Sequence, residues 1–215
     1  MKNLSKLAKI LQYILGRRPD EFGLLPDDQG YVRVKELIKV LHEEKWHQVR
    51  PGHLETLPLH VPQAGIEMDH NRIRVCARER LPALSEAPVV PKQLFAGIRR
   101  KAYEITLREG LRPQTHPASV LLFTDHELAM RVARRRDAEP VIVTVQTTVA
   151  QRAGIDFMRF GETIYLAALI PANCCRLPKR PKRAAVSRPA KDTPPPPPPP
   201  PPRPGAGGGG GRGAT

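Results

Sequence analysis

Two adjacent arginines, Arg17 and Arg18, stand between the end of a short apolar stretch at Gly16 and Pro19. A guanidinium group keeps its charge and matches phosphate oxygens through paired hydrogen bonds, so this pair could hold a phosphate. Paired arginines at a helix end can equally be solvated surface, which contributes little beyond solubility. The pair alone leaves both interpretations open.

Other residues offer charge or acid–base chemistry. Arg74 lies in the short apolar stretch "NRIRV", where a charged group requires a partner. The basic run "RVARRRD", residues 131–137, suits a helix C-terminus, where cations are favoured, and a solvated helix face explains it as well. His116 and Glu162 could transfer protons, although polar surface residues are common at such positions.

Length and charge limit the class of protein. The 215 residues suit one large or two small domains. The net charge is +14, and residues 178–215 hold eight basic residues against one acidic residue, which is +7. The first 177 residues carry the other +7, so nucleic-acid binding requires a localised basic patch.

The cysteines and the apolar segments indicate the compartment. Cys76, Cys174 and Cys175 have neither disulfide nor zinc spacing, so we expect a reduced cytosol and no structural metal. The N-terminus lacks the apolar core of a signal peptide, and no stretch approaches the roughly 20 apolar residues of a membrane span. We expect a soluble, cytoplasmic protein that is a monomer and does not bind membranes.

Residues 1–80 have the element order of a winged helix, a fold that often binds nucleic acid without proving that function. Asn3 is the expected N-cap of the first helix and Gly16 its expected C′ residue. The elements expected after it are a strand in "YVRV", a helix over 34–41, one or two helical turns in "RPGHLETL", and a hairpin of Ile66–Met68 and Arg72–Val75.

Residues 93–177 are expected to form a compact α+β lobe after a linker over 81–92. Thr124 and Glu127 form a capping-box pattern, T-D-H-E, at the start of a helix. The expected strands are "QLFAGI", "SVLLF", "PVIVTV" and one or two in "ETIYLAALIP", with a helix ending at Gly110. Residues 178–215, with nine consecutive prolines and a Gly-rich end, are expected to be disordered.

Four segments together resemble the RNA 2′-phosphotransferase family. "LSKLAKILQYILGRRPDEFGLLPDDQGYVRVKELI" is similar to the family pattern S-K-x-L-S-x-x-L-R-H-x-P followed by G-L-x-x-D-x-x-G-W-V. "NRIRV" resembles its I-R-A, and "LFAGI…ITLREGL" resembles its L-Y-H-G-T…I…E-G-L. "AGIDFMRFGETIYLAALIP" resembles its G-x-x-F followed by G-V-W-L-T and V-P-P. The resemblance covers about residues 4–171 and implies an N-terminal winged-helix lobe and a C-terminal ADP-ribosyltransferase-like lobe.

The resemblance also implies a reaction. Family members remove an internal 2′-phosphate from RNA, such as one left at a splice junction by some ligases. The phosphate attacks the nicotinamide ribose of NAD and expels nicotinamide, and transesterification then releases the RNA and ADP-ribose 1″,2″-cyclic phosphate. The implied co-substrate is NAD, the implied partner is RNA with a 2′-phosphate, and no metal is implied.

Family positions carry over residue by residue. The Arg-His pair of L-R-H-x-P falls on Gly16 and Arg17, and the arginine of I-R-A is retained as Arg74. The histidine of Y-H-G-T becomes Ala96, and the asparagine before G-V-W-L becomes Glu162. The resemblance implies catalytic roles for Arg17 and Arg74 and cofactor contacts by Phe95, Gly97 and Thr124. We expect Arg17 and Arg74, together with the nearby arginines Arg18 and Arg78, to bind phosphate or RNA. His116 and Glu162 are candidate substitutes for lost acid–base groups.

Three functions remain open. The first is an RNA 2′-phosphotransferase with a weak or altered active site. The second is a non-catalytic relative that binds RNA or a phosphorylated nucleotide through its arginines. Because binding needs the arginines and not the histidines, the residues fit this possibility. The third is ADP-ribosyl transfer to another acceptor through Glu162.

Overall fold

The computed structural model describes residues 2–113 and 119–179, and of Lys2 and Asn3 only the backbone. These described residues belong to one compact unit of α+β structure. The expected site residue His116 and the expected disorder after residue 179 lie outside the described residues. For clarity, we call residues 2–80 the N-terminal half and residues 81–179 the C-terminal half.

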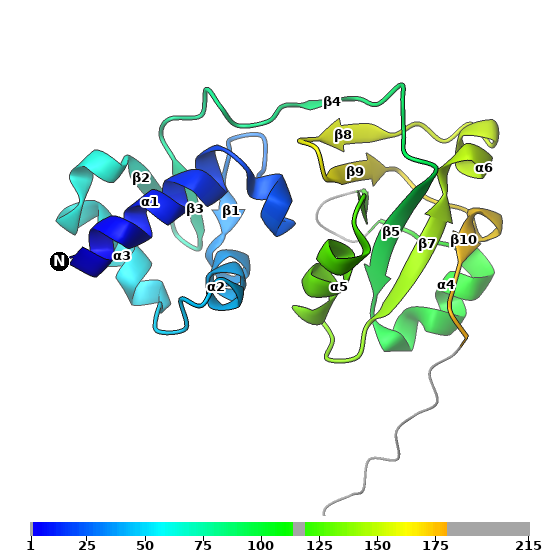
Figure 1. Ribbon diagram of the computed structural model, residues 1–215, viewed down its shortest axis with the longest axis horizontal. Helices are drawn as coiled ribbons and strands as arrows, with labels where there is room; N and C mark the ends of the chain where they lie inside the picture. Colours follow the sequence, from blue (N-terminus) through cyan, green and yellow to red (C-terminus); the bar gives the residue numbers. More distant parts are fainter. Residues whose placement is uncertain (1, 114–118, 180–215) are drawn as a thin grey trace, which may run out of the picture. The chain divides into compact units, whose positions relative to one another are not determined.

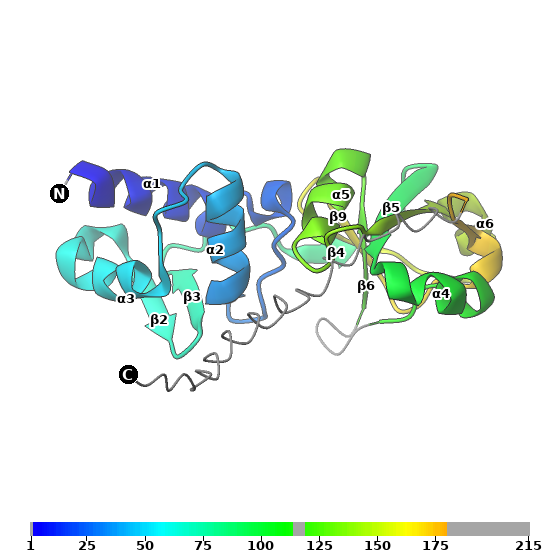
Figure 2. The same cartoon turned by 90° about the horizontal axis from the view of Figure 1, so that it is seen from below.

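The N-terminal half has helices around a three-stranded antiparallel sheet of order β1-β3-β2 (Figures 1 and 2). Strands β2 and β3 are the expected hairpin, and α2 follows β1 directly. The elements are α1 (Lys2–Gly16), η1 (Pro19–Phe22), β1 (Val32–Arg33), α2 (Val34–Glu43), α3 (Pro51–His60), η2 (Pro62–Ala64), β2 (Ile66–Asp69) and β3 (Arg72–Val75).

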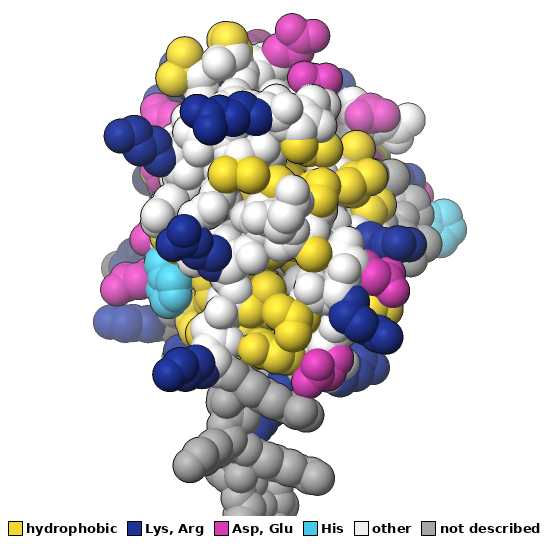
Figure 3. All heavy atoms as spheres, turned by 90° about the vertical axis from the view of Figure 1, so that its right-hand side faces the viewer, with side chains coloured by type: hydrophobic (Ala, Val, Ile, Leu, Met, Phe, Trp, Pro, Cys, Tyr) yellow, Lys and Arg dark blue, Asp and Glu magenta, His cyan; other side chains and the backbone are white. Residues whose placement is uncertain are grey.

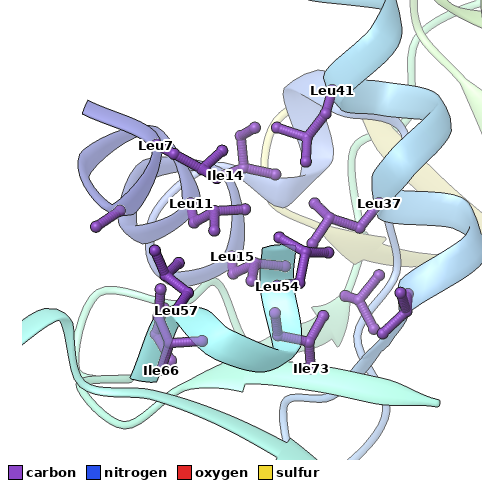
Figure 4. Packing of buried hydrophobic residues seen from close by; sticks show 14 of the residues in the cluster. Leu7, Leu11, Ile14, Leu15, Leu37, Leu41, Leu54, Leu57, Ile66 and Ile73 are labelled. Carbon is purple, nitrogen blue, oxygen red and sulfur yellow. The ribbon is translucent and has the colours of Figure 1, made fainter. Parts of the chain in front are cut away.

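One apolar core holds this half together. Figure 4 shows side chains of α1, α2 and α3 pointing toward one another and toward strands β2 and β3. Burying apolar side chains at the helical spacing of α1 explains why this stretch is a helix. The labelled residues are Leu7, Leu11, Ile14, Leu15, Leu37, Leu41, Leu54, Leu57, Ile66 and Ile73.

Three local expectations for this half were wrong. Asn3 lies inside α1 and does not cap it, because the helix begins at Lys2. Gly16 is the last residue of α1 and has no left-handed φ. A Cβ there would lie 2.8 Å from Val75 Cγ2, so close packing on β3 requires the glycine. Helix α3 has 10 residues instead of one or two turns, because Leu54 and Leu57 are buried in the core.

The C-terminal half is built on a seven-stranded antiparallel sheet of order β10-β7-β5-β6-β9-β8-β4. Its elements are β4 (Leu84–Glu86), β5 (Gln93–Ile98), η3 (Arg100–Ala102), α4 (Tyr103–Glu109), β6 (Val120–Phe123), α5 (His126–Arg134), β7 (Val141–Gln146), α6 (Thr147–Arg152), β8 (Met158–Phe160), β9 (Ile164–Ala167), η4 (Ala172–Cys174) and β10 (Cys175–Arg176).

Alternate residues of the strands face two separate cores. Leu94 and Ala96 of β5 belong to one core, whereas Phe95 packs against the other, which contains Leu128 and Val132 of α5. This is the period of two that a sheet with both faces covered requires. Strand β7, expected to be buried on both faces, has buried residues in both cores.

Two expectations for this half differ from the structure. Part of the expected linker is strand β4, which pairs with β8 and forms the edge of the sheet. The three residues of β4 are exposed, so they show no alternation of buried and exposed side chains that would predict a strand. Only the backbone hydrogen bonds to β8 define β4 as a strand. Asp125, not Thr124, caps α5, since the Asp125 carboxylate accepts hydrogen bonds from the backbone of Glu127 and Leu128.

The described residues contain neither a helix that could span a membrane nor a group of side chains that could bind a metal ion. No helix of residues 2–113 and 119–179 is long and apolar enough to cross a bilayer. Within the same residues, no three His, Cys, Asp or Glu side chains are grouped to hold a metal ion.

Figure 3 shows a face of the C-terminal half where apolar side chains lie exposed between lysines and arginines. The exposed apolar residues of this half include Ile105 and Leu107 of α4.

Candidate functional site

Arg17 and Arg18 have different surroundings at the end of α1. Arg18 pairs with Asp20, Glu21 and Glu162, at N–O distances of 3.5, 3.2 and 3.0 Å. Burial opposes the charge of Arg18, but these carboxylates outweigh it and raise its pKa. Arg17 is exposed and has no carboxylate partner among the described residues. Arg17 is therefore the member of the pair whose charge can meet an external anion.

Asp20 fixes the segment that carries these arginines. It is fully buried, and its Oδ2 accepts a hydrogen bond of 2.8 Å from the backbone N–H of Glu162. Its backbone carbonyl accepts a second bond, of 2.7 Å, from the Thr163 hydroxyl. A Cβ at Gly161 would lie 2.3 Å from Asp20 Cγ, so the β8–β9 turn approaches as closely as glycine allows. The end of α1 is thus anchored on the C-terminal half.

Arg74 and Arg78 converge on one backbone oxygen. Their Nη1 atoms donate to the carbonyl of Gln29 at 3.0 and 2.8 Å. Gln29 belongs to the turn "PDDQG", and Gly30 is packed under the Arg78 side chain, since a Cβ there would lie 2.9 Å from Arg78 Cδ. Two like charges at one neutral oxygen create a positive potential that an anion would relieve.

One carboxylate partly balances this pair. The Glu67 carboxylate accepts a hydrogen bond of 2.8 Å from Arg74 Nε, and this bond lowers the pKa of Glu67 and raises that of Arg74. The Arg74 guanidinium also lies 4.4 Å from the centre of the Tyr31 ring. The expectation that Arg74 needs a partner is confirmed. Among residues 2–113 and 119–179, Glu67 is the one carboxylate that pairs with these arginines, so one negative charge faces the two positive charges of Arg74 and Arg78.

Helix α1 brings Arg17 to the same region. Gly16 packs on Val75, and each is the chain neighbour of one of the two arginines, Arg17 and Arg74. The residues expected to hold phosphate therefore fall into two groups. Arg74 and Arg78 share an oxygen beside the end of α1 that bears Arg17, whereas Arg18 is engaged with carboxylates.

The expected cofactor residues lie on the C-terminal sheet. Gly97 lines a small cavity of about 70 Å³, together with Ala96, Ile98, Leu121 and Phe123. A Cβ at Gly97 would lie 2.3 Å from Ala133 Cβ, so α5 packs directly on β5 at this point.

The other expected residues lie outside this small cavity. Phe95 contacts the ring of His126 edge-on, at 5.4 Å between centroids, and the Thr124 backbone donates to the carbonyl of Thr163. Glu162 has a side chain that is 77% exposed and pairs with Arg18. Neither Phe95, Thr124 nor Glu162 lines the cavity around Gly97.

A larger cavity of about 380 Å³ lies next to the small one, and both are lined by Leu121, Val132 and Arg136. Tyr31, Arg33 and Arg72 line the larger cavity from the N-terminal half. Sequence reasoning missed these residues and the Gln29 carbonyl. The turn "PDDQG" followed by an aromatic residue was the available signal, but a turn does not reveal which side chains gather around its carbonyl groups.

The comparisons with known proteins decide the family. No protein-family model matches the chain. A protein of Acetivibrio thermocellus with the name "Probable RNA 2'-phosphotransferase" is 32% identical over 175 residues, which are 80% of this chain and 96% of the relative. The chain belongs to the RNA 2′-phosphotransferase family. Relatives with the same name from Thermococcus kodakarensis and Bacillus thuringiensis subsp. konkukian are 26% and 28% identical over 174 residues, 80% of this chain and 96% and 94% of theirs.

The family resemblance inferred from the sequence is thus confirmed. In this member of the family, the roles of Arg17, Arg18, Arg74 and Arg78 stay predictions, as do those of Phe95, Gly97, Thr124 and Glu162.

Proposed function

We propose that this protein binds RNA that carries an internal 2′-phosphate and removes the phosphate slowly, by transfer to NAD. The observation that carries the proposal is the pair of guanidinium groups of Arg74 and Arg78 on the Gln29 carbonyl. A phosphate dianion offers these groups more hydrogen-bond acceptors and more charge than one neutral carbonyl. Exposed Arg17 at the adjoining end of α1 adds a third cation.

The arginines supply binding and charge stabilisation, not proton transfer. Guanidinium groups stay protonated, so Arg17 in place of the family histidine keeps anion affinity and loses acid–base capacity. Arg74 and Arg78 would orient the phosphate, and Arg17 would offset charge that develops on it during transfer. The expected rate is therefore low and the expected affinity for phosphorylated RNA is retained.

The residues expected to contact NAD do not fit a dinucleotide as they stand. The cavity around Gly97 has about 70 Å³, whereas ligand pockets usually have roughly 300–1,000 Å³. Arg112, Ser119 and Arg136 also line this cavity, so the misfit is one of volume and not of polar groups. We therefore assign no NAD contact to the residues of this cavity.

This misfit favours a second candidate function, a relative that binds 2′-phosphorylated RNA without turning over NAD. Such a protein needs the three arginines Arg17, Arg74 and Arg78, which we call the arginine cluster, and it does not need a dinucleotide site. By contrast, no observation favours ADP-ribosyl transfer through Glu162, because that carboxylate is paired with Arg18. We place either activity in a reducing compartment such as the cytosol, because all three cysteines are free.

The test combines turnover and binding on one substrate. Purified protein is mixed with NAD and an oligoribonucleotide bearing one internal 2′-phosphate, and phosphate loss and ADP-ribose cyclic phosphate are followed. Slow turnover that disappears in Arg74→Ala supports the transferase. Binding without turnover at high protein concentration selects the second candidate. If phosphorylated and unphosphorylated RNA bind equally and neither reacts, both proposals fail.

A further inference from the structure

We propose that the cavity of about 380 Å³ holds one nucleotide of the RNA strand, next to the nucleotide whose 2′-phosphate meets Arg74. In this proposal Arg33 contacts a phosphodiester of the strand. The inference rests on the proposed function, which supplies the RNA, and adds a second subsite and a binding residue to it. The volume lies within the range of roughly 300–1,000 Å³ typical of small-ligand sites.

The charge of the cavity suits a phosphodiester. Arg33, Lys39, Arg72, Arg135 and Arg136 line it, against Asp27 and Glu36. Arg72 is balanced by Asp27 and Asp69, and Arg135 by a two-pronged pair with Glu43 at 2.7 Å for each hydrogen bond.

Arg33 differs from these balanced arginines. Its side chain is exposed, and no carboxylate pairs with it among residues 2–113 and 119–179. A charge without a partner at the wall of a cavity is available to a ligand, and phosphate is the anion that guanidinium groups match best. Arg33 is therefore the residue that we expect to contact the RNA backbone.

The remaining wall suits a base or a sugar. Leu25, Pro26, Leu121 and Val132 give the cavity an apolar side opposite in character to its arginines. A nucleotide has the same division, with a flat, poorly hydrated base at one end and a charged phosphate at the other. A free inorganic anion would leave this apolar wall without a partner, so a nucleotide fits the lining better.

Continuity with the arginine cluster indicates that the nucleotide belongs to RNA. Tyr31 lines the cavity, and the guanidinium groups of Arg72 and Arg74 lie 4.8 and 4.4 Å from the centre of its ring. One aromatic ring thus separates the cavity from the arginine proposed to hold the 2′-phosphate. Successive nucleotides of one strand would occupy the two places, because the 2′-phosphate proposed to meet Arg74 belongs to that strand.

The test compares Arg33→Gln with Lys35→Gln in the full chain. Lys35 is an exposed cation two residues away that does not line the cavity. Equilibrium binding of a single-stranded hexaribonucleotide, with and without a central 2′-phosphate, is measured over a range of salt concentrations. Arg33→Gln should weaken binding of both RNAs by about tenfold at low salt and reduce the salt slope by about 0.7. Lys35→Gln should match the wild type.

The outcomes separate this inference from the proposed function. If the wild type prefers phosphorylated RNA and Arg33→Gln binds like Lys35→Gln, the inference is overturned and the proposed function stands. If Arg33→Gln weakens RNA binding but the wild type ignores the 2′-phosphate, the subsite stands and the proposed function falls. If Arg33→Gln instead weakens binding of NAD and leaves RNA affinity unchanged, the cavity serves a dinucleotide and the inference is overturned.

Discussion

Cys76 and Arg74 share the Glu67 carboxylate, so the reactivity of the Cys76 thiol depends on the charge beside Arg74. The thiol donates to the Glu67 carboxylate at 3.2 Å, and this hydrogen bond raises the pKa of Cys76 above its ordinary value of 9.0. The same carboxylate binds Arg74. Because the thiolate is the reactive form, the reaction rate of Cys76 measures the influence of Glu67 at this site.

We predict that Glu67→Gln makes Cys76 react roughly three- to tenfold faster with a thiol reagent at pH 7.5, since the amide lacks the charge that opposes the thiolate. The other two thiols provide an internal control, because Cys174 is buried and burial raises the pKa of Cys175 to about 11. Labelling followed by mass spectrometry gives the rates. An unchanged Cys76 rate in Glu67→Gln would show that the carboxylate does not govern this site.

Asp20 is the residue on which the position of Arg17 and Arg18 depends. It is buried, and it links the segment after α1 to the β8–β9 turn through its carboxylate and its backbone carbonyl. We predict that Asp20→Ala costs about 3 kcal/mol, since it leaves the part-buried N–H of Glu162 without its acceptor and removes one of the three carboxylates that pair with Arg18. At roughly 2–4 °C per kcal/mol for a chain of this size, the melting temperature should fall by about 10 °C.

Asp28→Ala is the matched control for this loss. Asp28 is exposed in the turn before Gly30, and such surface substitutions usually stay within about 0.5 kcal/mol of the wild type. Thermal unfolding of both variants measures the difference. A loss in Asp20→Ala no larger than in Asp28→Ala would mean that the bond from the Glu162 N–H to the Asp20 carboxylate contributes nothing to stability.

At the scale of elements, η1 and α5 meet at a position that accepts only glycine. Gly23 has a φ of +63°, and a Cβ there would lie 2.2 Å from Val132 Cγ2. Gly154 also has a positive φ, of +78°, but nothing lies within 4 Å of its Cβ position. Substituting Gly154 therefore measures the cost of backbone strain alone, whereas substituting Gly23 measures that strain together with the clash against α5.

We predict that Gly154→Ala costs about 1 kcal/mol, the strain of a left-handed residue. Gly23→Ala should cost about 3 kcal/mol, because overpacking against Val132 adds to that strain. In the double variant Gly23→Ala/Val132→Ala, shortening the neighbour should return part of the overpacking cost. Chemical unfolding of the four proteins tests this. Equal losses in Gly23→Ala and Gly154→Ala would contradict packing of η1 on α5.

The sequence predicted those elements whose apolar residues follow a clear period. The spacing of Leu7, Leu11 and Ile14 predicted α1, and the β-branched run of β7 predicted a strand buried on both faces. The cap of α5 was misassigned because Thr124 and Asp125 are both good N-cap residues, and only backbone geometry selects Asp125. Strand β4 was missed because its pairing with β8 rests on backbone hydrogen bonds.

The candidate site was predictable only where a side chain belongs to a known pattern. Arg74 could be identified because its segment resembles a family motif, whereas the Gln29 carbonyl has no residue-type signal at all. Arg33 and Tyr31 became candidates only once the cavity that they line was known. Long-range packing places these groups together, and a linear pattern does not encode such distances.

At the scale of the whole molecule, charge is divided between the compact unit and the C-terminal segment. Residues 181–215 hold six basic residues and one acidic residue, which is +5 of the total +14. Charges near a bound strand add to affinity through counterion release without regard to a particular phosphate. The arginine cluster, by contrast, is built around a fixed oxygen position. Affinity and selectivity should therefore separate when the chain is shortened.

We predict that a chain ending at Arg180 binds RNA more weakly at low salt and has a shallower salt slope, by about 0.7 for each lost phosphate contact. Its preference for 2′-phosphorylated over unphosphorylated RNA should equal that of the full chain, because Arg17, Arg74 and Arg78 remain. Titrations of both RNAs at several salt concentrations measure slope and preference together. Loss of the preference on truncation would move phosphate selection from the arginine cluster to residues 181–215, whereas an unchanged slope would exclude those residues from RNA binding.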